Sequence, residues 1–245
     1  MFSGPNRGWD SLSTNQKLMI AVVAVLVLYG IAVSGGQGFL GRLANPDWLI
    51  AATIIVFVAF PIHEFAHAAM AVYLGDETPR WQGRLTLEPM AHVDPLGAIL
   101  IFVMGFGWAK PVQWNPANIR VDQQLGSILV AIVGPLSNLL LAAIALLAVR
   151  IGANFLPTGT INAMWGIASA FASINVLLFV FNMIPVPPLD GSHILFALLP
   201  GDTYALRAQL SQFGIFIILG VGYIAPQIIW GPTQLILSMM IELIL

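Results

Sequence analysis

Long apolar runs, separated by short polar or Gly- and Pro-containing stretches, dominate the chain. A membrane-spanning helix needs about 20 mostly apolar residues. Six runs reach or approach this length, at residues 18–33, 48–74, 125–149, 161–184, 204–224 and 228–245. The pattern predicts an all-α polytopic membrane protein with about six transmembrane helices. We expect a single domain over residues 1–245, with its core at about 48–199, an N-terminal helix within 1–47 and C-terminal helices within 200–245.

The first run is short for a full span and follows a polar stretch of some 17 residues. A signal peptide is the alternative interpretation, because Ala32, Val33 and Ser34 form an acceptable cleavage site. The polar front is long for the charged region of a signal peptide, which favours a retained helix.

Residues 75–124 form the least hydrophobic part of the chain and separate the second run from the third. Apolar and polar residues alternate over 84–88, beside Gly83 and Pro89, which predicts a short strand in a membrane-associated β-hairpin. Residues 95–109 are apolar but number only 15, so we expect a re-entrant or interfacial segment rather than a span.

With six spans, both chain ends, residues 75–124 and the loop before the fifth run share one side of the membrane. That side collects seven basic residues, Arg7, Lys17, Arg80, Arg84, Lys110, Arg120 and Arg207, against Arg42 and Arg150 on the other. Because basic residues concentrate in cytoplasmic loops, we expect a multi-pass protein of the cell membrane with cytoplasmic termini.

Composition supports a membrane protein and narrows its chemistry. Hydrophobic residues make up 58% of the 245 positions and charged residues 8%, with a mean hydropathy of +0.89. The formal charge of −2 and the absence of a basic run argue against nucleic acid as a partner. With no cysteine in the chain, a metal would have to bind histidines and carboxylates.

An H-E-x-x-H motif, from His63 through Glu64 to His67, lies inside the second apolar run. Residues four apart project from the same face of a helix, so both imidazoles can bind one metal ion with Glu64 beside it. Ionisable groups inside a membrane are costly, which makes a purely structural role a weak alternative. Two histidines without cysteine suit Zn²⁺, which needs a third protein ligand and keeps its fourth position for water.

Asp190 is the leading candidate for the third ligand, because it ends a Pro-rich break after the fourth run. The prolines cannot continue that helix, and we expect extended backbone there. A helix-capping role for Asp190 is the alternative. His193 is either a ligand, a supporting partner or an interfacial histidine, and we expect His92 and Asp94 to be solvated or to form turns.

At this point the sequence resembles the site-2 protease family of intramembrane zinc metalloproteases, peptidase family M50. The resemblance covers roughly residues 48–199 and rests on the H-E-x-x-H motif, on N-x-x-P-x-x-P-L-D-G at 182–191, on G-P-L-S-N at 134–138, and on the stretches 85–97 and 107–112. It implies that His63, His67 and Asp190 bind one Zn²⁺ per chain, that Glu64 is the general base, and that Asn182 contacts the substrate or the developing oxyanion. Membrane-spanning proteins would be the substrates.

The chain departs from the family pattern in one place and leaves two alternatives open. Glu88 stands where the family's L-T-L-N-P pattern has asparagine, and no PDZ-like insertion is visible. Residues 84–88 would either add a substrate as an extended strand or form a hairpin that covers the site. A metal-binding membrane transporter or sensor without protease activity is the competing function.

Overall fold

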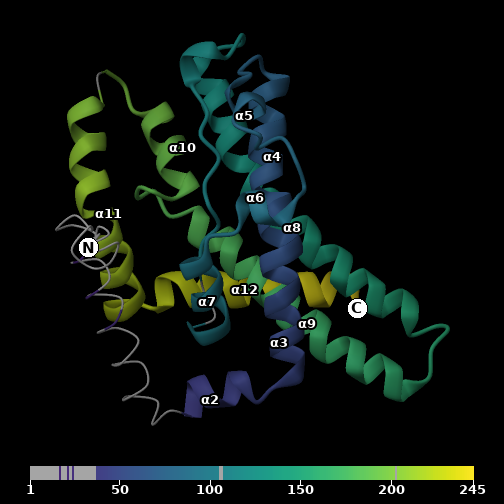
Figure 1. Cartoon of the computed structure of the whole chain (residues 1–245). Coiled ribbons are helices and arrows are strands. Elements are labelled where there is room, and N and C mark those ends of the chain that lie inside the picture. The colour runs from purple at the N-terminus through teal and green to yellow at the C-terminus, as the bar shows by residue number, and fades with distance from the viewer. Residues whose placement is uncertain (1–16, 18–20, 22–23, 25–36, 105–106, 202) are drawn as a thin grey trace, which may run out of the picture. The chain divides into compact units, whose positions relative to one another are not determined.

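The computed structural model describes residues 37–104, 107–201 and 203–245, together with residues 17, 21 and 24. Its longer elements are all helices (Figure 1). They are α2 (Gln37–Leu43), α3 (Pro46–Ile54), α4 (Phe60–Tyr73), α5 (Thr78–Trp81), α6 (Pro89–His92), α7 (Pro95–Met104), α8 (Gln123–Gly152), α9 (Thr158–Asn182), α10 (Asp190–Leu198), α11 (Tyr204–Ile224) and α12 (Gln227–Ile244).

The chain divides into two compact units, residues 1–45 and residues 46–245. The first unit contains α2. It also contains the first predicted span, residues 18–33, which lies outside the described residues except for positions 21 and 24. The second unit contains α3 to α12 and every residue of the expected site.

Four helices of the described residues are long and apolar enough to cross a membrane: the continuous helix Pro46–Tyr73, then α8, α9 and α12. They match four of the predicted runs and confirm an all-helical, multi-pass membrane protein. The fifth run forms helix α11 but is not among these four, so the predicted count of six is not supported. Figure 1 shows α12 lying crosswise to α3 and α4 rather than alongside them.

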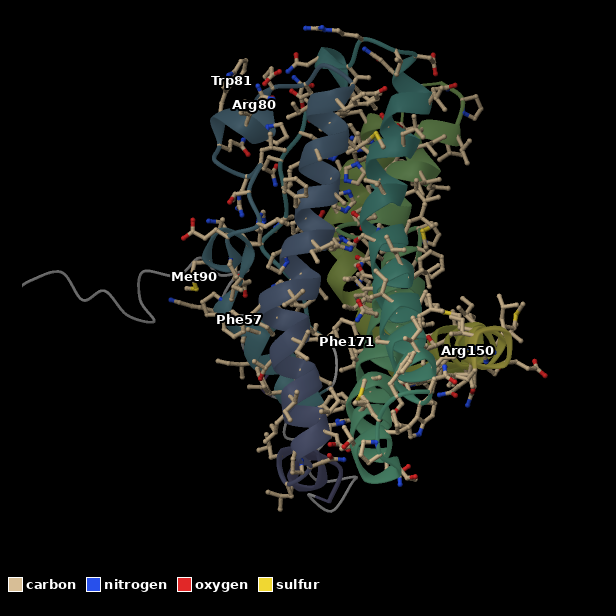
Figure 2. All side chains as sticks on the ribbon, turned by 90° about the vertical axis from the view of Figure 1, so that its right-hand side faces the viewer. Phe57, Arg80, Trp81, Met90, Arg150 and Phe171 are labelled. Atoms are coloured by element: carbon tan, nitrogen blue, oxygen red, sulfur yellow. The ribbon has the colours of Figure 1, made fainter. Side chains whose placement is uncertain are left out.

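The core lies where the continuous helix Pro46–Tyr73 packs against α9 and α7. Phe171 and Ile174 of α9 pack with Ile55 of the first long helix, and Figure 2 shows Phe171 pointing into the interior. Small residues are frequent at the contacts, among them the fully buried Ala142 and Ala172. Lipid offers no hydrophobic drive for helices to associate, so close approach at small residues supplies the packing energy.

A π-helical turn, Ile55–Ala59, joins α3 to α4 without breaking the long helix. A π turn holds one residue more than an α turn, so the helix faces before and after it are offset in sequence. Here α3 packs mainly against α9, and α4 packs mainly against α8. The turn therefore lies where the long helix changes its packing partner, just before the H-E-x-x-H motif.

The predicted strand at residues 84–88 does not form, and the predicted β-hairpin is wrong. Residues 85 and 86 make bends and residues 84, 87 and 88 have no regular structure, because polar groups of this loop bond one another. A guanidinium N–H of Arg84 donates to the carbonyl of Ala91, and His92 Nε2 donates to the carbonyl of Thr86 over 2.8 Å. Leu87 is exposed, so the alternation did not mark one buried face. An isolated antiparallel bridge between Val93 and Ala109 is the β pairing found in the described residues.

The apolar segment 95–109 begins as the ten-residue helix α7. At 1.5 Å per residue it extends about 15 Å, half the hydrocarbon thickness of a membrane. This length agrees with the prediction that the segment does not span.

Candidate metal centre

Helix α4 carries the H-E-x-x-H motif on its buried face. His63, Glu64 and His67 are exposed by only 7%, 7% and 5%. His67 precedes the last residue of the helix, Tyr73, by six positions, or about 9 Å along the axis. The motif therefore lies within the long helix, toward its C-terminal end.

Asp190 meets both histidines. Its Oδ2 lies 3.3 Å from Nε2 of His63 and 3.3 Å from Nε2 of His67, and the two Nε2 atoms are 3.1 Å apart. The three side chains are the one cluster of histidines and carboxylates, among the described residues, arranged to share a metal ion. The predicted grouping of His63, His67 and Asp190 is thus present in the structure.

Asp190 reaches this position as the first residue of α10. After α9 ends at Asn182, residues 183–189 turn back, with the N–H of Val186 donating to the carbonyl of Ile184 and the N–H of Leu189 to that of Val186. The expected extended backbone is therefore a series of turns. Asp190 is in the first turn of a helix, as the capping alternative supposed, yet its Oδ2 is buried without a hydrogen-bond donor and points at the histidines.

The other ring nitrogen of each histidine is bonded to α8. Nδ1 of His63 donates to Oδ1 of Asn138 over 2.8 Å, and Nδ1 of His67 donates to the carbonyl of Val130 over 2.6 Å. A histidine that donates from Nδ1 keeps the lone pair of Nε2 free for a metal. Two Nε2 lone pairs and a carboxylate oxygen then converge, and three acceptors this close can bind one cation between them.

Helix α8 approaches the histidines closely because Gly134 has no side chain. A Cβ at this position would overlap the ring of His67. Pro135 follows inside the same continuous helix and lacks the N–H that would bond the carbonyl of Ala131. The missing side chain of Gly134 is what allows the α8 backbone to come within hydrogen-bonding distance of His67.

Glu64 is held by the main chain of a distant segment. Its Oε2 accepts a hydrogen bond from the N–H of Val112 over 2.8 Å. Val112 belongs to residues 109–118, which we call the crossing segment because it runs from the Val93–Ala109 bridge to the end of α4. In the same segment, the centroid of the Trp114 ring lies 5.3 Å from the centroid of the His193 ring.

The remaining candidates are not part of the group of three potential ligands. Asn182 ends α9, and its Nδ2 donates to the carbonyl of Leu178 over 3.0 Å. His193 contacts Trp114 and is absent from the cluster around Asp190. Asp94 caps α7 by accepting from the N–H of Gly97, as the turn interpretation predicts. The expectation of a solvated His92 is wrong, because His92 is fully buried.

Sequence reasoning gave no role to Asn138 or Val112. Asn138 is part of the G-P-L-S-N segment and Val112 of the stretch 107–112, and both were noticed only as part of the resemblance. Their partners lie 75 and 48 positions away in the chain. No local spacing predicts such contacts.

Comparison with known proteins agrees with this geometry. The model of the family "Peptidase family M50" matches residues 151–221. "Putative zinc metalloprotease YwhC" of Bacillus subtilis (strain 168) is 39% identical over 185 residues, which cover 72% of this chain and 83% of that protein. "Putative zinc metalloprotease Rip2" of Mycobacterium tuberculosis (strain H37Rv) is 30% identical over 172 residues, covering 69% of this chain and 64% of its own length. No solved structure matches the chain. With a relative this similar over most of its length, the chain belongs to peptidase family M50.

Proposed function

We propose that the chain hydrolyses peptide bonds within or near the transmembrane segments of membrane proteins, with zinc held by His63, His67 and Asp190 and with Glu64 as general base. The family consists of peptidases, and the similar proteins carry zinc metalloprotease in their names. The chain is thus a membrane-embedded zinc metalloprotease. The observation that carries the residue assignment is the convergence of three acceptor atoms within 3.3 Å of one another.

The donor set fits zinc. Structural surveys place nitrogen and carboxylate oxygen ligands about 2.0–2.2 Å from Zn²⁺, and a catalytic site uses three of them and leaves one position open. Tetrahedral ligands at these lengths lie roughly 3.3–3.6 Å apart, close to the separations of 3.1, 3.3 and 3.3 Å found here. The orphaned Oδ2 of Asp190 is explained if it faces a cation.

Bound zinc would supply a Lewis acid that polarises the scissile carbonyl and makes water acidic. Glu64 accepts the proton of the attacking water and later donates it to the leaving amine. One carboxylate oxygen of Glu64 is fixed by Val112, which leaves the other free for this proton. The burial of Glu64 limits the access of competing water.

Asn182 is proposed to contact the substrate carbonyl or the oxyanion. Its amide nitrogen carries two hydrogens, and one is used by the carbonyl of Leu178. The second hydrogen is available to a substrate oxygen. Asn182 is the last residue of α9 and precedes Asp190 by eight residues. We propose that it contacts the substrate from this position.

A metal transporter or sensor is not favoured as the function. Such a protein needs further polar groups along a path, whereas the described residues contain the one cluster of three potential ligands. It also has no use for a buried carboxylate beside the ligands that is oriented by a main-chain N–H.

The orientation in the membrane is a further proposal, and it rests on the distribution of basic residues. We propose that the end of the bundle that carries Arg80 faces the cytoplasm and that the end near Arg150 faces outward. Figure 2 shows Arg80 and Trp81 at one end, well separated from Arg150. The prediction places both termini on the cytoplasmic side with six spans. A guanidinium N–H of Arg150, however, donates to the carbonyl of Leu245, so the last residue lies beside a residue assigned to the outside.

Cysteine labelling in intact cells tests this orientation, since the chain has no cysteine of its own. Single cysteines at positions 80, 154 and 245 would be treated with a membrane-impermeant thiol reagent. We expect labelling at 154 and none at 80. Labelling at 80 would reverse the orientation, and labelling at 245 would show that the C-terminus is not cytoplasmic.

The function itself is tested with purified wild type, Glu64→Gln and the double variant His63→Ala/His67→Ala, each incubated with a panel of single-span membrane proteins in detergent. Glu64→Gln keeps about one zinc per chain and loses about 10²–10⁴-fold in turnover, because the amide cannot accept the proton. The double variant loses zinc and activity together. Zinc retained without both histidines, or normal turnover in Glu64→Gln, would refute the assignment.

A further inference from the structure

Asp76 is a buried carboxylate that the proposed reaction does not use. It lies just after α4, it has no exposed surface, and the hydrogen-bond partners of its two oxygens among the described residues include no basic side chain. Its Oδ1 accepts from the N–H of Thr78 (3.1 Å), from the Thr78 hydroxyl (2.5 Å) and from Nδ2 of Asn118 (2.9 Å). Its Oδ2 accepts from the N–H of Asn115 (2.6 Å). Asp76 thus connects the end of α4 to the crossing segment by hydrogen bonds.

The crossing segment is the same stretch of chain that holds Glu64. Val112 donates to Glu64 only three residues before Asn115 donates to Asp76. Three residues of extended chain span about 10 Å, so the position of Asn115 restricts where the N–H of Val112 can point. Glu64 lies within helix α4, and Asp76 lies three residues after its last residue, Tyr73.

The two ends of the segment are fixed in different ways. At its start, the main chain pairs with residues 92 and 93: Ala109 is bridged to Val93, and the N–H of Lys110 donates to the carbonyl of His92 over 2.7 Å. At its other end, the Asp76 carboxylate receives one main-chain and one side-chain donor of the segment. Just beyond this end, the N–H of Arg120 donates to the carbonyl of Leu74 over 2.8 Å, and Ile119 packs against Leu74. Loss of the carboxylate would remove the hydrogen bond of Asn115, which is the anchor closest to Val112 on this side.

We propose that Asp76 is a positioning residue for the general base: by binding the N–H of Asn115, it fixes the crossing segment so that the N–H of Val112 is aimed at the carboxylate of Glu64. This inference rests on the proposed role of Glu64. It assigns to Asp76 an effect on the rate of the chemical step, transmitted through the main chain, in addition to any contribution to folding.

Asp76→Asn is the sharpest variant, because it changes one oxygen and keeps the shape. The amide oxygen can still serve Thr78 and Asn118 in the place of Oδ1. The amide nitrogen then replaces Oδ2 opposite the N–H of Asn115, and two donors cannot form a hydrogen bond with each other. The bond to the crossing segment is therefore lost selectively.

The first readout is independent of activity. Val112 is 8% exposed, and Val112→Cys keeps the main-chain N–H and introduces the chain's single thiol. In detergent, N-ethylmaleimide should modify this thiol slowly in the otherwise wild-type protein and at least tenfold faster when Asp76→Asn is added. Gln113→Cys, at an exposed neighbouring position, should react rapidly in both backgrounds. An unchanged rate at position 112 would overturn the proposal even if the enzyme is active.

The matched control is Asp122→Asn. Asp122 is an exposed aspartate that caps α8 by accepting from the N–H of Leu125, and it has no bond to the crossing segment. This variant should leave the thiol at position 112 protected. If Asp122→Asn exposes that thiol as much as Asp76→Asn does, the effect is general loosening of the fold and the proposal fails.

The second readout is kinetic and uses whichever single-span protein of the panel is cleaved fastest by wild type. Asp76→Asn should retain about one zinc per chain and an unchanged KM, while kcat falls about 10–100-fold, as expected for a misplaced catalytic group. Val112→Pro removes the N–H directly, and combining it with Asp76→Asn should cost little more than either change alone. Additive losses, or loss of zinc from Asp76→Asn, would overturn the proposal. Failure of the proposed function shows separately, as normal turnover in Glu64→Gln.

Discussion

Nδ1 of His63 donates a hydrogen bond to Oδ1 of Asn138, 2.8 Å away, although the two residues are 75 positions apart in the chain. Asn138 is fully buried on α8, and its own Nδ2 has no hydrogen-bond partner in the described residues. The amide is therefore oriented by its acceptor side. It fixes both the tautomer and the rotation of an imidazole whose Nε2 faces the other two proposed ligands.

Replacing Asn138 by alanine should weaken zinc binding about 10–100-fold, the usual cost of losing a partner that orients a metal ligand. The measurement is competition with a chromogenic zinc chelator on the purified protein. Asn154→Ala is the matched control, because Asn154 is an exposed asparagine whose Nδ2 donates only locally, to the carbonyl of Arg150. Equal zinc affinity in both variants would show that Asn138 does not support His63.

Gly134→Ala should abolish zinc binding or the folded state, because the new methyl group would overlap the His67 ring. The alternative, a shift of α8, would break the bond from His67 to the carbonyl of Val130. Zinc content and thermal unfolding in detergent measure the outcome. Gly159→Ala adds the same methyl group to a helix where no atom lies within 4 Å, and it should behave as wild type. A Gly134→Ala protein with full zinc content would contradict the close approach.

Asp190→Ala and His193→Ala should have different effects although the residues are one helical turn apart. The first change removes the proposed third ligand and should eliminate both zinc and activity. The second removes a ring that contacts Trp114 and should retain most of the zinc. Metal analysis of the two proteins side by side decides the matter. If Asp190→Ala keeps its zinc and His193→Ala loses it, then His193 rather than Asp190 is the third ligand.

Acid should weaken the fold through Asp76. Burial acts to raise the pKa of Asp76, but hydrogen bonds from the side chain of Thr78, the N–H of Asn115 and the side chain of Asn118 outweigh it, so the pKa lies below its ordinary value. The unfolded chain then binds the proton more tightly. The stabilisation is complete above the unfolded pKa of about 3.9 and is lost as the pH falls through the lower folded pKa. Thermal unfolding of wild type and Asp76→Asn should therefore differ more at pH 7 than at pH 3, and a constant difference would argue against this linkage.

The parts predicted correctly from sequence have a local physical signature. Four long apolar runs correspond to the four candidate spans, because a bilayer demands uninterrupted hydrophobic length. The closeness of His63 to His67 follows from helical spacing, whereas their role as zinc ligands together with Asp190 stays a proposal. Each of these signals occupies fewer than about 30 neighbouring residues.

The parts that were missed depend on contacts between distant segments. Nothing near Val112 in the sequence shows that its N–H is donated to Glu64, and nothing near His92 shows that its ring is fully buried. The alternation at residues 84–88 misled for the same reason: a strand needs a partner strand, and here the polar groups of the loop satisfy one another. The local sequence pattern identifies residues with suitable chemistry, whereas contacts between distant segments determine how their side chains are oriented.

The π-helical turn before α4 has a consequence for changes in chain length. Deleting one residue from Ile55–Ala59 can be absorbed by converting the π turn into an ordinary α turn, with the flanking helices left in register. Insertion of one residue at the same place has no such compensation, and it would rotate the histidines by about 100° away from α8. A deletion and an insertion in the same turn should thus differ completely in zinc binding, because the turn can lose its extra residue but cannot take up a second one.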